Sequence, residues 1–158
     1  MLSLQRMQEK HREQVLQLEV LPEQVKFVGE IEEILANESE QVLPHVMVDD
    51  DQVVGFFLID LSYPQHYEFA SSNSLGLRAY FVGRQFQGKG YGTPGVQHLP
   101  SFLDETYNSY DAVYLTVNCK NLAAFQCYLK AGFVDTEELY LGGDAGPQHI
   151  MKRACSLD

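Results

Sequence analysis

The sequence is poor in basic residues, in cysteine and in long apolar runs. Its 158 residues hold 11 Lys and Arg against 22 Asp and Glu, which gives a formal net charge of −11. No basic patch is present in the sequence, so a nucleic-acid partner is not expected. No apolar run approaches bilayer-spanning length, so no membrane association is expected. Residues 1–10 lack the apolar segment of a signal peptide, and we therefore expect a cytoplasmic location.

Residues that typically bind metal are few and not grouped. Cys119, Cys127 and Cys155 have no spacing typical of a metal or redox site, and their odd number indicates reduced thiols. The five histidines show no ligand spacing either, so we expect no metal. The acidic balance is compatible with a cationic substrate, but solubility alone also explains it.

Length and composition fit a single domain spanning 1–158 with a full hydrophobic core. A polar loop rich in aromatic residues is expected at 62–74, and its length indicates either a functional loop or a surface excursion. The order of the apolar patterns predicts an α/β (α+β) fold, with a mixed sheet and helices on both faces. Strands are expected at 2–7, 45–48, 53–61, 75–82, 112–117, 133–141 and 148–152, and helices at 8–20, 22–36, 96–103 and 122–130.

One glycine-rich segment, Gln87–Gly92, lies between the strand expected at 75–82 and the helix that follows. There, backbone N–H groups and the positive end of the helix dipole point at one spot, which favours a phosphate or pyrophosphate. Glycine allows φ > 0 and a close approach of the backbone to the ligand. A tight strand-to-helix turn would also explain the pattern. Thr93-Pro94 follows Gly92, so a Walker loop is not supported. The late position in the chain disfavours a dinucleotide fold.

Two motifs together resemble those of the GNAT superfamily of acetyl-CoA-dependent N-acetyltransferases. Gln87–Gly92 is similar to its (Gln/Arg)-x-x-Gly-x-Gly/Ala signature. Leu115–Asn121, followed by Ala124, Tyr128 and Gly132-Phe133, is similar to its second signature. Two separated motifs are more specific than either alone, and the element order agrees along essentially the whole chain. The resemblance implies a mostly antiparallel sheet with a splayed central strand, and it is nearest to bacterial acetyltransferases of small amines, including the spermine/spermidine type.

The resemblance also implies acetyl-CoA as cosubstrate and a role for each matching residue. Amides of the glycine loop hold the pyrophosphate, the central strand pairs with the pantetheine arm, and a tyrosine, Tyr128, protonates the departing thiolate as the catalytic residue. For Tyr128 the alternative is an ordinary core aromatic, and Asn121 is also a good helix N-cap. The implied coenzyme-binding residues are Phe81, Val82, Gln87, Gly88, Lys89, Gly90, Gly92, Thr93 and Asn121.

The general base does not follow from the motifs. An amine attacks only as the neutral species, so a proton must leave an ammonium group. Many relatives carry an acid on the central strand, where this chain has Arg78 and Tyr80. A water held by an acidic side chain would serve instead, and the candidates are Glu19, Glu23, Asp60 and Glu68.

Together these observations predict an enzyme that moves an acetyl group from acetyl-CoA to a primary amine of a small molecule, by direct attack in a ternary complex. Two alternatives stay open: a protein or peptide N-acetyltransferase, and an acyl-CoA-binding module without catalysis. The missing strand acid is the reason for the second. A homodimer is a possible assembly, because relatives often dimerise.

Overall fold

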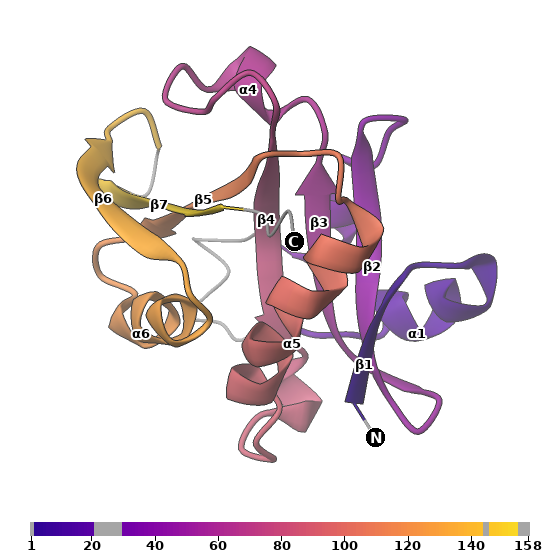
Figure 1. The fold of residues 1–158 in the computed structure, drawn as a ribbon. Coiled ribbons are helices and arrows are strands. Elements are labelled where there is room, and N and C mark those ends of the chain that lie inside the picture. Colours follow the sequence, from indigo (N-terminus) through magenta and orange to yellow (C-terminus); the bar gives the residue numbers. More distant parts are fainter. Residues whose placement is uncertain (1, 21–29, 144–145, 155–158) are drawn as a thin grey trace.

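The computed structural model describes residues 2–20, 30–143 and 146–154, and its seven strands form one sheet (Figure 1). The strand order is β1-β2-β3-β4-β5-β7-β6. Every neighbouring pair is antiparallel except β4 and β5, which are parallel. The strands are β1 (Leu2–Arg6), β2 (Val42–Asp49), β3 (Gln52–Asp60), β4 (Ser74–Val82), β5 (Ala112–Asn118), β6 (Val134–Tyr140) and β7 (Gln148–Ala154).

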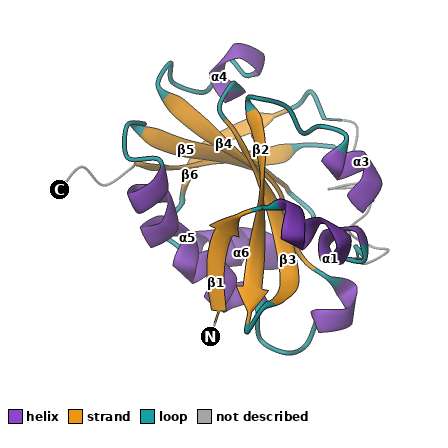
Figure 2. Ribbon diagram, turned by 90° about the vertical axis from the view of Figure 1, so that its right-hand side faces the viewer, coloured by secondary structure: helices purple, strands orange, loops and turns teal. Residues whose placement is uncertain are grey.

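Helices cover both faces of this sheet. Figure 2 shows α5 and α6 on one side and α1 and α3 on the other. The mixed, mostly antiparallel sheet predicted from the sequence is thereby confirmed. The helical elements are the 3-10 turns η1 (Glu9–His11) and η2 (Arg84–Phe86) and the helices α1 (Arg12–Leu16), α3 (Ile31–Leu35), α4 (Tyr63–His66), α5 (Gly92–Thr106) and α6 (Leu122–Lys130).

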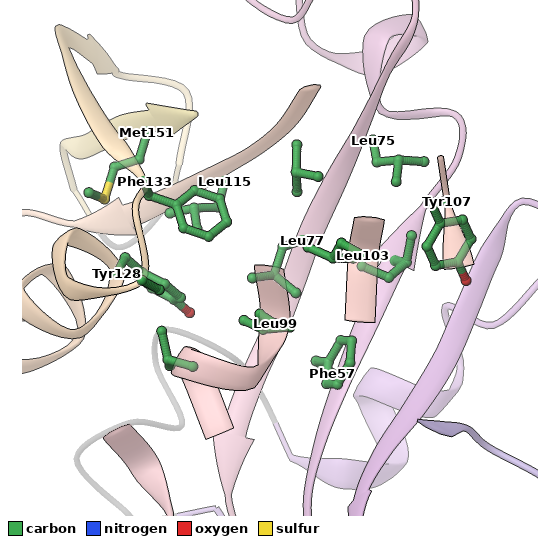
Figure 3. Packing of buried hydrophobic residues seen from close by; sticks show 14 of the residues in the cluster. Phe57, Leu75, Leu77, Leu99, Leu103, Tyr107, Leu115, Tyr128, Phe133 and Met151 are labelled. Atoms are coloured by element: carbon green, nitrogen blue, oxygen red, sulfur yellow. The ribbon is translucent and has the colours of Figure 1, made fainter. Parts of the chain in front are cut away.

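Each face of the sheet has its own apolar core. The core beneath α5 and α6 includes Leu77, Leu99, Leu115 and Tyr128, and Figure 3 shows how these side chains meet. The core beneath α1 and α3 combines residues of these helices and the loop after α1 with residues of β2, β3 and β4. Its members are Val15, Leu18, Val20, Ile31, Ile34, Val42, Val46, Val48, Val53, Phe56, Leu58 and Phe81. Both layers therefore fix the central strands, on which the candidate site depends.

Several predicted element bounds were wrong. The helix expected at 8–20 is a 3-10 turn and a short helix that ends at Leu16, although Leu18 and Val20 are buried as the periodicity required. Of the helix expected at 22–36, only the part from residue 30 onward lies within the described residues, where α3 is found. The loop at 62–74 contains the short helix α4, which was not predicted.

The helix expected at 96–103 is longer at both ends, because α5 begins at Gly92 and ends at Thr106. Pro94 is its third residue, where a missing N–H costs nothing because no intrahelical acceptor is available to the first turn. Pro100 lies inside the helix and deprives the Val96 carbonyl of its usual N–H donor, yet α5 continues past it.

A hydrogen bond to a buried histidine connects β2 to the end of α5. The ring of His45 is fully buried, and its Nδ1–H donates to the Leu43 carbonyl at 2.9 Å. Since Nδ1 carries the proton, Nε2 accepts from the Tyr107 hydroxyl at 2.8 Å. Burial lowers the pKa of His45 to about 4, so the imidazole is neutral in the folded protein.

This histidine is expected to make the fold sensitive to acid. Its pKa is about 6.5 in the unfolded chain, so between pH 6.5 and 4 the unfolded state binds a proton that the folded state excludes. Stability therefore falls as the pH falls, and going from pH 7 to 5 should cost about 2 kcal/mol through this group alone. Urea unfolding of the wild type and of His45→Gln at both pH values checks this. An equal loss in the variant would contradict the assignment.

Candidate active site

The two parallel strands of the sheet separate soon after they begin. β4 and β5 pair only through Ser74–Gly76 and Ala112–Tyr114, and beyond these residues they diverge (Figure 1). From Leu77 to Val82, the edge of β4 that faces β5 has no strand partner among the described residues. The splayed central strand expected from the sequence is present. Apart from the Val82 carbonyl, which accepts from the Gln87 side chain, no described strand pairs with this edge, so an extended ligand could add to it as a further strand.

A cavity of about 410 Å³ lies between the diverging strands. This volume is in the range typical of small-molecule sites. Six of the ten predicted site residues line it: Phe81, Val82, Gln87, Gly92, Asn121 and Tyr128. The other four lie on the adjoining chain: Gly88, Lys89 and Gly90 are exposed residues of the glycine loop, and Thr93 is the second residue of α5.

A β-bulge in β4 shapes the cavity wall. Ala79 and Tyr80 together oppose the single residue Phe57 of β3, and Ala79 has a φ of 55°. The extra residue shifts the alternation of side chains along the strand. Leu77 and Tyr80 consequently pack on the α5 face, while Phe81 packs in the core beneath α1 and α3. Sequence periodicity alone would have put Leu77 and Phe81 on the same face.

The glycine loop leads from β4 into α5 with two residues in the left-handed region. Gly88 has a φ of 78° and Gly90 a φ of 83°, a conformation that side chains disfavour. A Cβ at either position would meet no atom within 4 Å, so the space in front of the loop is open. The first N–H groups of α5 have no intrahelical acceptor. Loop and helix start thus form an anion-binding arrangement.

Side chains of the loop serve structural contacts. The Gln87 side-chain amide donates to the Val82 carbonyl at 2.8 Å and so ties the loop to the end of β4. The Lys89 ammonium lies 5.7 Å from the centre of the Phe86 ring. The Tyr80 hydroxyl donates to the Gly92 carbonyl at 3.2 Å and holds the start of α5 over β4. Sequence analysis missed this role of Tyr80, because a strand tyrosine resembles an ordinary core residue.

Tyr128 of α6 is buried at the opposite wall of the cavity. Its side chain is 8% exposed and packs against Phe133 and Tyr80, with ring centroids at 5.7 Å and 6.2 Å. Figure 3 shows its hydroxyl directed away from α6 toward β4. No hydrogen bond joins this hydroxyl to another described residue. Burial raises the pKa of Tyr128 above its ordinary value, so the group is protonated and can donate.

Asn121 has the capping role that the sequence indicated. Its side-chain oxygen accepts from the Ala124 N–H at 3.4 Å at the start of α6, and the residue also lines the cavity. Asn118 at the end of β5 lines the cavity as well, and its side-chain oxygen accepts from the Lys120 N–H at 2.9 Å. In the sequence, nothing separates Asn118 from an ordinary turn residue.

None of the described acidic candidates for the base lines the cavity. Asp60 is buried and accepts two hydrogen bonds from Ser62, through its N–H at 2.9 Å and its hydroxyl at 2.7 Å. It also forms an ion pair with Arg78 at 3.2 Å. Glu19 and Glu68 are exposed to solvent and do not line the cavity. Glu23 lies outside the described residues. Among the described residues no cluster of three potential metal ligands occurs.

A sequence model described as the acetyltransferase (GNAT) family matches residues 5–133 of the chain. The chain belongs to this family. Among its relatives, the uncharacterized N-acetyltransferase YbbJ of Bacillus subtilis is 30% identical over 109 residues, 68% of each chain. The spermine/spermidine N(1)-acetyltransferase of the same organism is 26% identical over 136 residues, which cover 85% of this chain and 88% of the relative.

Solved structures of acetyltransferases share the fold. The aminoglycoside acetyltransferase AAC(6')-Ib in complex with coenzyme A has a TM-score of 0.75 at 19% identity, over 98% of this chain and 95% of that one. The Vibrio cholerae spermidine N-acetyltransferase in complex with coenzyme A and spermine has a TM-score of 0.70 at 17% identity, over 98% and 95%. The predicted GNAT family and fold are thus confirmed, and acetyl-CoA is the expected cosubstrate of this acetyltransferase. No described helix has the length and apolarity to cross a membrane.

The site of this acetyltransferase fits the coenzyme. The exposed glycines leave room for a diphosphate, and the open edge of β4 accepts an amide-containing arm. The buried hydroxyl of Tyr128, which has no hydrogen-bond partner among the described residues, completes the fit at the far wall. The cavity lining includes Gln87 and Gly92 at the two ends of the glycine loop, Phe81 and Val82 of β4, and Tyr128.

Proposed function

We propose that this acetyltransferase moves the acetyl group of acetyl-CoA to the primary amine of a small molecule, by direct attack while both substrates are bound. The proposal rests on one observation: residues from three features line the same cavity. These features are the unpaired edge of β4, the glycine loop before α5, and the Tyr128 hydroxyl.

The coenzyme supplies a reactive thioester, and the chain supplies its binding and orientation. Backbone amides of Gln87, Gly88, Lys89, Gly90, Gly92 and Thr93 would hold the diphosphate at the positive end of α5. The backbone of Phe81 and Val82 would pair with the pantetheine arm, and the Asn121 side chain would contact it from the start of α6. Gln87 keeps its own side chain on the Val82 carbonyl, which preserves the loop shape.

Tyr128 is proposed to give its proton to the departing thiolate. A phenol is protonated at neutral pH, burial raises the pKa of Tyr128 further, and the rings of Tyr80 and Phe133 pack beside it. The acceptor's own proton is proposed to leave through water, because the described part of the cavity lining holds no carboxylate.

A small acceptor is favoured by the cavity volume and by the relatives. The cavity of about 410 Å³ must hold the end of the coenzyme and the acceptor together. One relative is named for spermine and spermidine, and one structural neighbour for aminoglycosides. A cytoplasmic location and a homodimer belong to the proposal as well, and light scattering of the purified protein checks the dimer.

A screen of amines with acetyl-CoA tests the proposal by following release of the free thiol. It should include polyamines, aminoglycosides, amino acids and peptides. Turnover with at least one small amine, confirmed by the mass of the acetylated product, is expected. Calorimetric binding of acetyl-CoA without turnover of any amine would favour a binding module instead. Turnover with peptides alone would favour a peptide N-acetyltransferase.

A further inference from the structure

One charged side chain faces the cavity on the side toward α3 and α4. This part of the lining contains Asn37, Tyr63, Tyr67 and Arg78. Arg78 is in the middle of β4, and its side chain is 33% exposed. No Asp or Glu of the described residues contributes to the lining, so its described part has one formal charge, and that charge is positive.

The ion pair with Asp60 holds the Arg78 guanidinium in place but uses only one of its N–H donors. Asp60 is 1% exposed, and one of its carboxylate oxygens is taken by Ser62. Its other oxygen accepts from Nη1 of Arg78 at 3.2 Å. No further hydrogen bond joins this guanidinium to the described residues, and a guanidinium has five N–H donors. Asp60 is thus a buried anchor that orients Arg78, and the arginine is the group that an acceptor meets.

Aromatic rings support the same part of the cavity. Tyr63 and Tyr67 of the α4 segment stack at 4.4 Å between ring centroids, and both line the cavity. Burial raises the pKa of both phenols, and the nearby Arg78 charge acts in the opposite direction. The planar Arg78 guanidinium, held beside these aromatic rings, suits a carboxylate. It can bind a carboxylate through two parallel hydrogen bonds.

We propose that the acceptor of this enzyme carries a carboxylate as well as the reacting amine, as an amino acid does, and that Arg78 binds that carboxylate. The inference rests on the proposed function and narrows its substrate class. A polycation would place positive charge against a fixed guanidinium in a lining without a described carboxylate. An amino acid would pair its carboxylate with that guanidinium and leave its amine free to reach the thioester.

The test compares acceptors that share a skeleton. Wild-type enzyme and acetyl-CoA are incubated with an amino acid and with its carboxamide, for example phenylalanine, tyrosine, lysine and ornithine, with spermidine and an aminoglycoside alongside. For at least one pair we expect kcat/KM to favour the carboxylate by about tenfold or more. The amide has the more readily deprotonated amine, so intrinsic reactivity would favour it instead. A preference for the carboxylate therefore reports recognition of the charge.

Variants then locate that recognition. Arg78→Gln alone leaves a buried, unpaired Asp60, so the double variant Asp60→Asn/Arg78→Gln is measured with it, and thermal unfolding verifies both folds. The carboxylate preference should fall to within about twofold of unity in the double variant, while turnover of the amide persists. Arg12→Gln is the matched control. Arg12 is 35% exposed and is also paired with carboxylates, Glu9 and Glu38, but lies outside the lining.

The outcomes separate the two levels of the proposal. If no amine of any kind is acetylated, both the proposed function and this inference fail. If spermidine, an aminoglycoside or the carboxamides react as well as the amino acids or better, the enzyme is an amine acetyltransferase but Arg78 does not select a carboxylate. A preference that survives in the folded double variant would also overturn the role of Arg78.

Discussion

Replacing Tyr128 with phenylalanine is expected to lower kcat by about 100-fold or more, with less than about a twofold change in the Kd of acetyl-CoA. The substitution removes one oxygen from a buried side chain and leaves the ring in place. Because that hydroxyl bonds no other described residue, its loss breaks no hydrogen bond within the described part of the chain. What disappears is the proton donor at the wall of the cavity. Steady-state kinetics with any accepted amine, together with calorimetry of acetyl-CoA binding, measures both quantities.

Tyr110→Phe is the control for this substitution. Tyr110 is also partly buried and packs against the same core, with its ring 6.5 Å from that of Tyr107, but it does not line the cavity. It should keep kcat within about twofold of the wild type. If Tyr128→Phe kept its kcat as well, the thiolate would leave without help from this residue, and the assignment of Tyr128 would be wrong.

The parts of the site that the sequence predicted are those fixed by local patterns. The glycine loop follows from three alternating glycines between a strand and a helix. Two of them, Gly88 and Gly90, have the positive φ that glycine allows. Asn121 caps α6, as an asparagine ahead of a helical stretch should. All seven strands of the sheet were predicted, because each segment contains its own apolar pattern and the turn residues that bound it, although β2 begins at Val42 and not at His45.

The parts that were missed depend on contacts between distant segments. Nothing in Leu75–Val82 indicates a bulge, since alanine disfavours a positive φ and Ala79 adopts it only where β3 and the packed cores hold it. The ion pair between Arg78 of β4 and Asp60 of β3 joins two strands. In the sequence, each of these residues alone resembles an ordinary surface charge. The helix predicted from 8 onward stops at Leu16, because Leu18 and Val20 reach the core without helical backbone.

The double substitution Gly88→Ala/Gly90→Ala is expected to raise the Kd of acetyl-CoA by about 100-fold while the melting temperature changes little. Each alanine at a positive φ costs about 1–2 kcal/mol. The loop is exposed and a Cβ meets no atom within 4 Å, so the free protein can relax this cost by changing the loop. Binding of the diphosphate requires the original loop conformation, so the strain of the two alanines would weaken the affinity for acetyl-CoA. Calorimetry with acetyl-CoA and a thermal melt measure the two effects.

Gly146→Ala separates backbone strain from loss of the coenzyme site. Gly146 has a φ of 104°, a Cβ there also meets no atom within 4 Å, and the residue does not line the cavity. This variant should carry about the strain of one of the two loop substitutions but bind acetyl-CoA within about twofold of the wild type. An unchanged Kd in the double variant would mean that the loop amides do not hold the diphosphate. The proposed placement of the coenzyme along β4, with its thioester near Tyr128, depends on binding of the diphosphate by the loop amides. That placement would then be wrong as well.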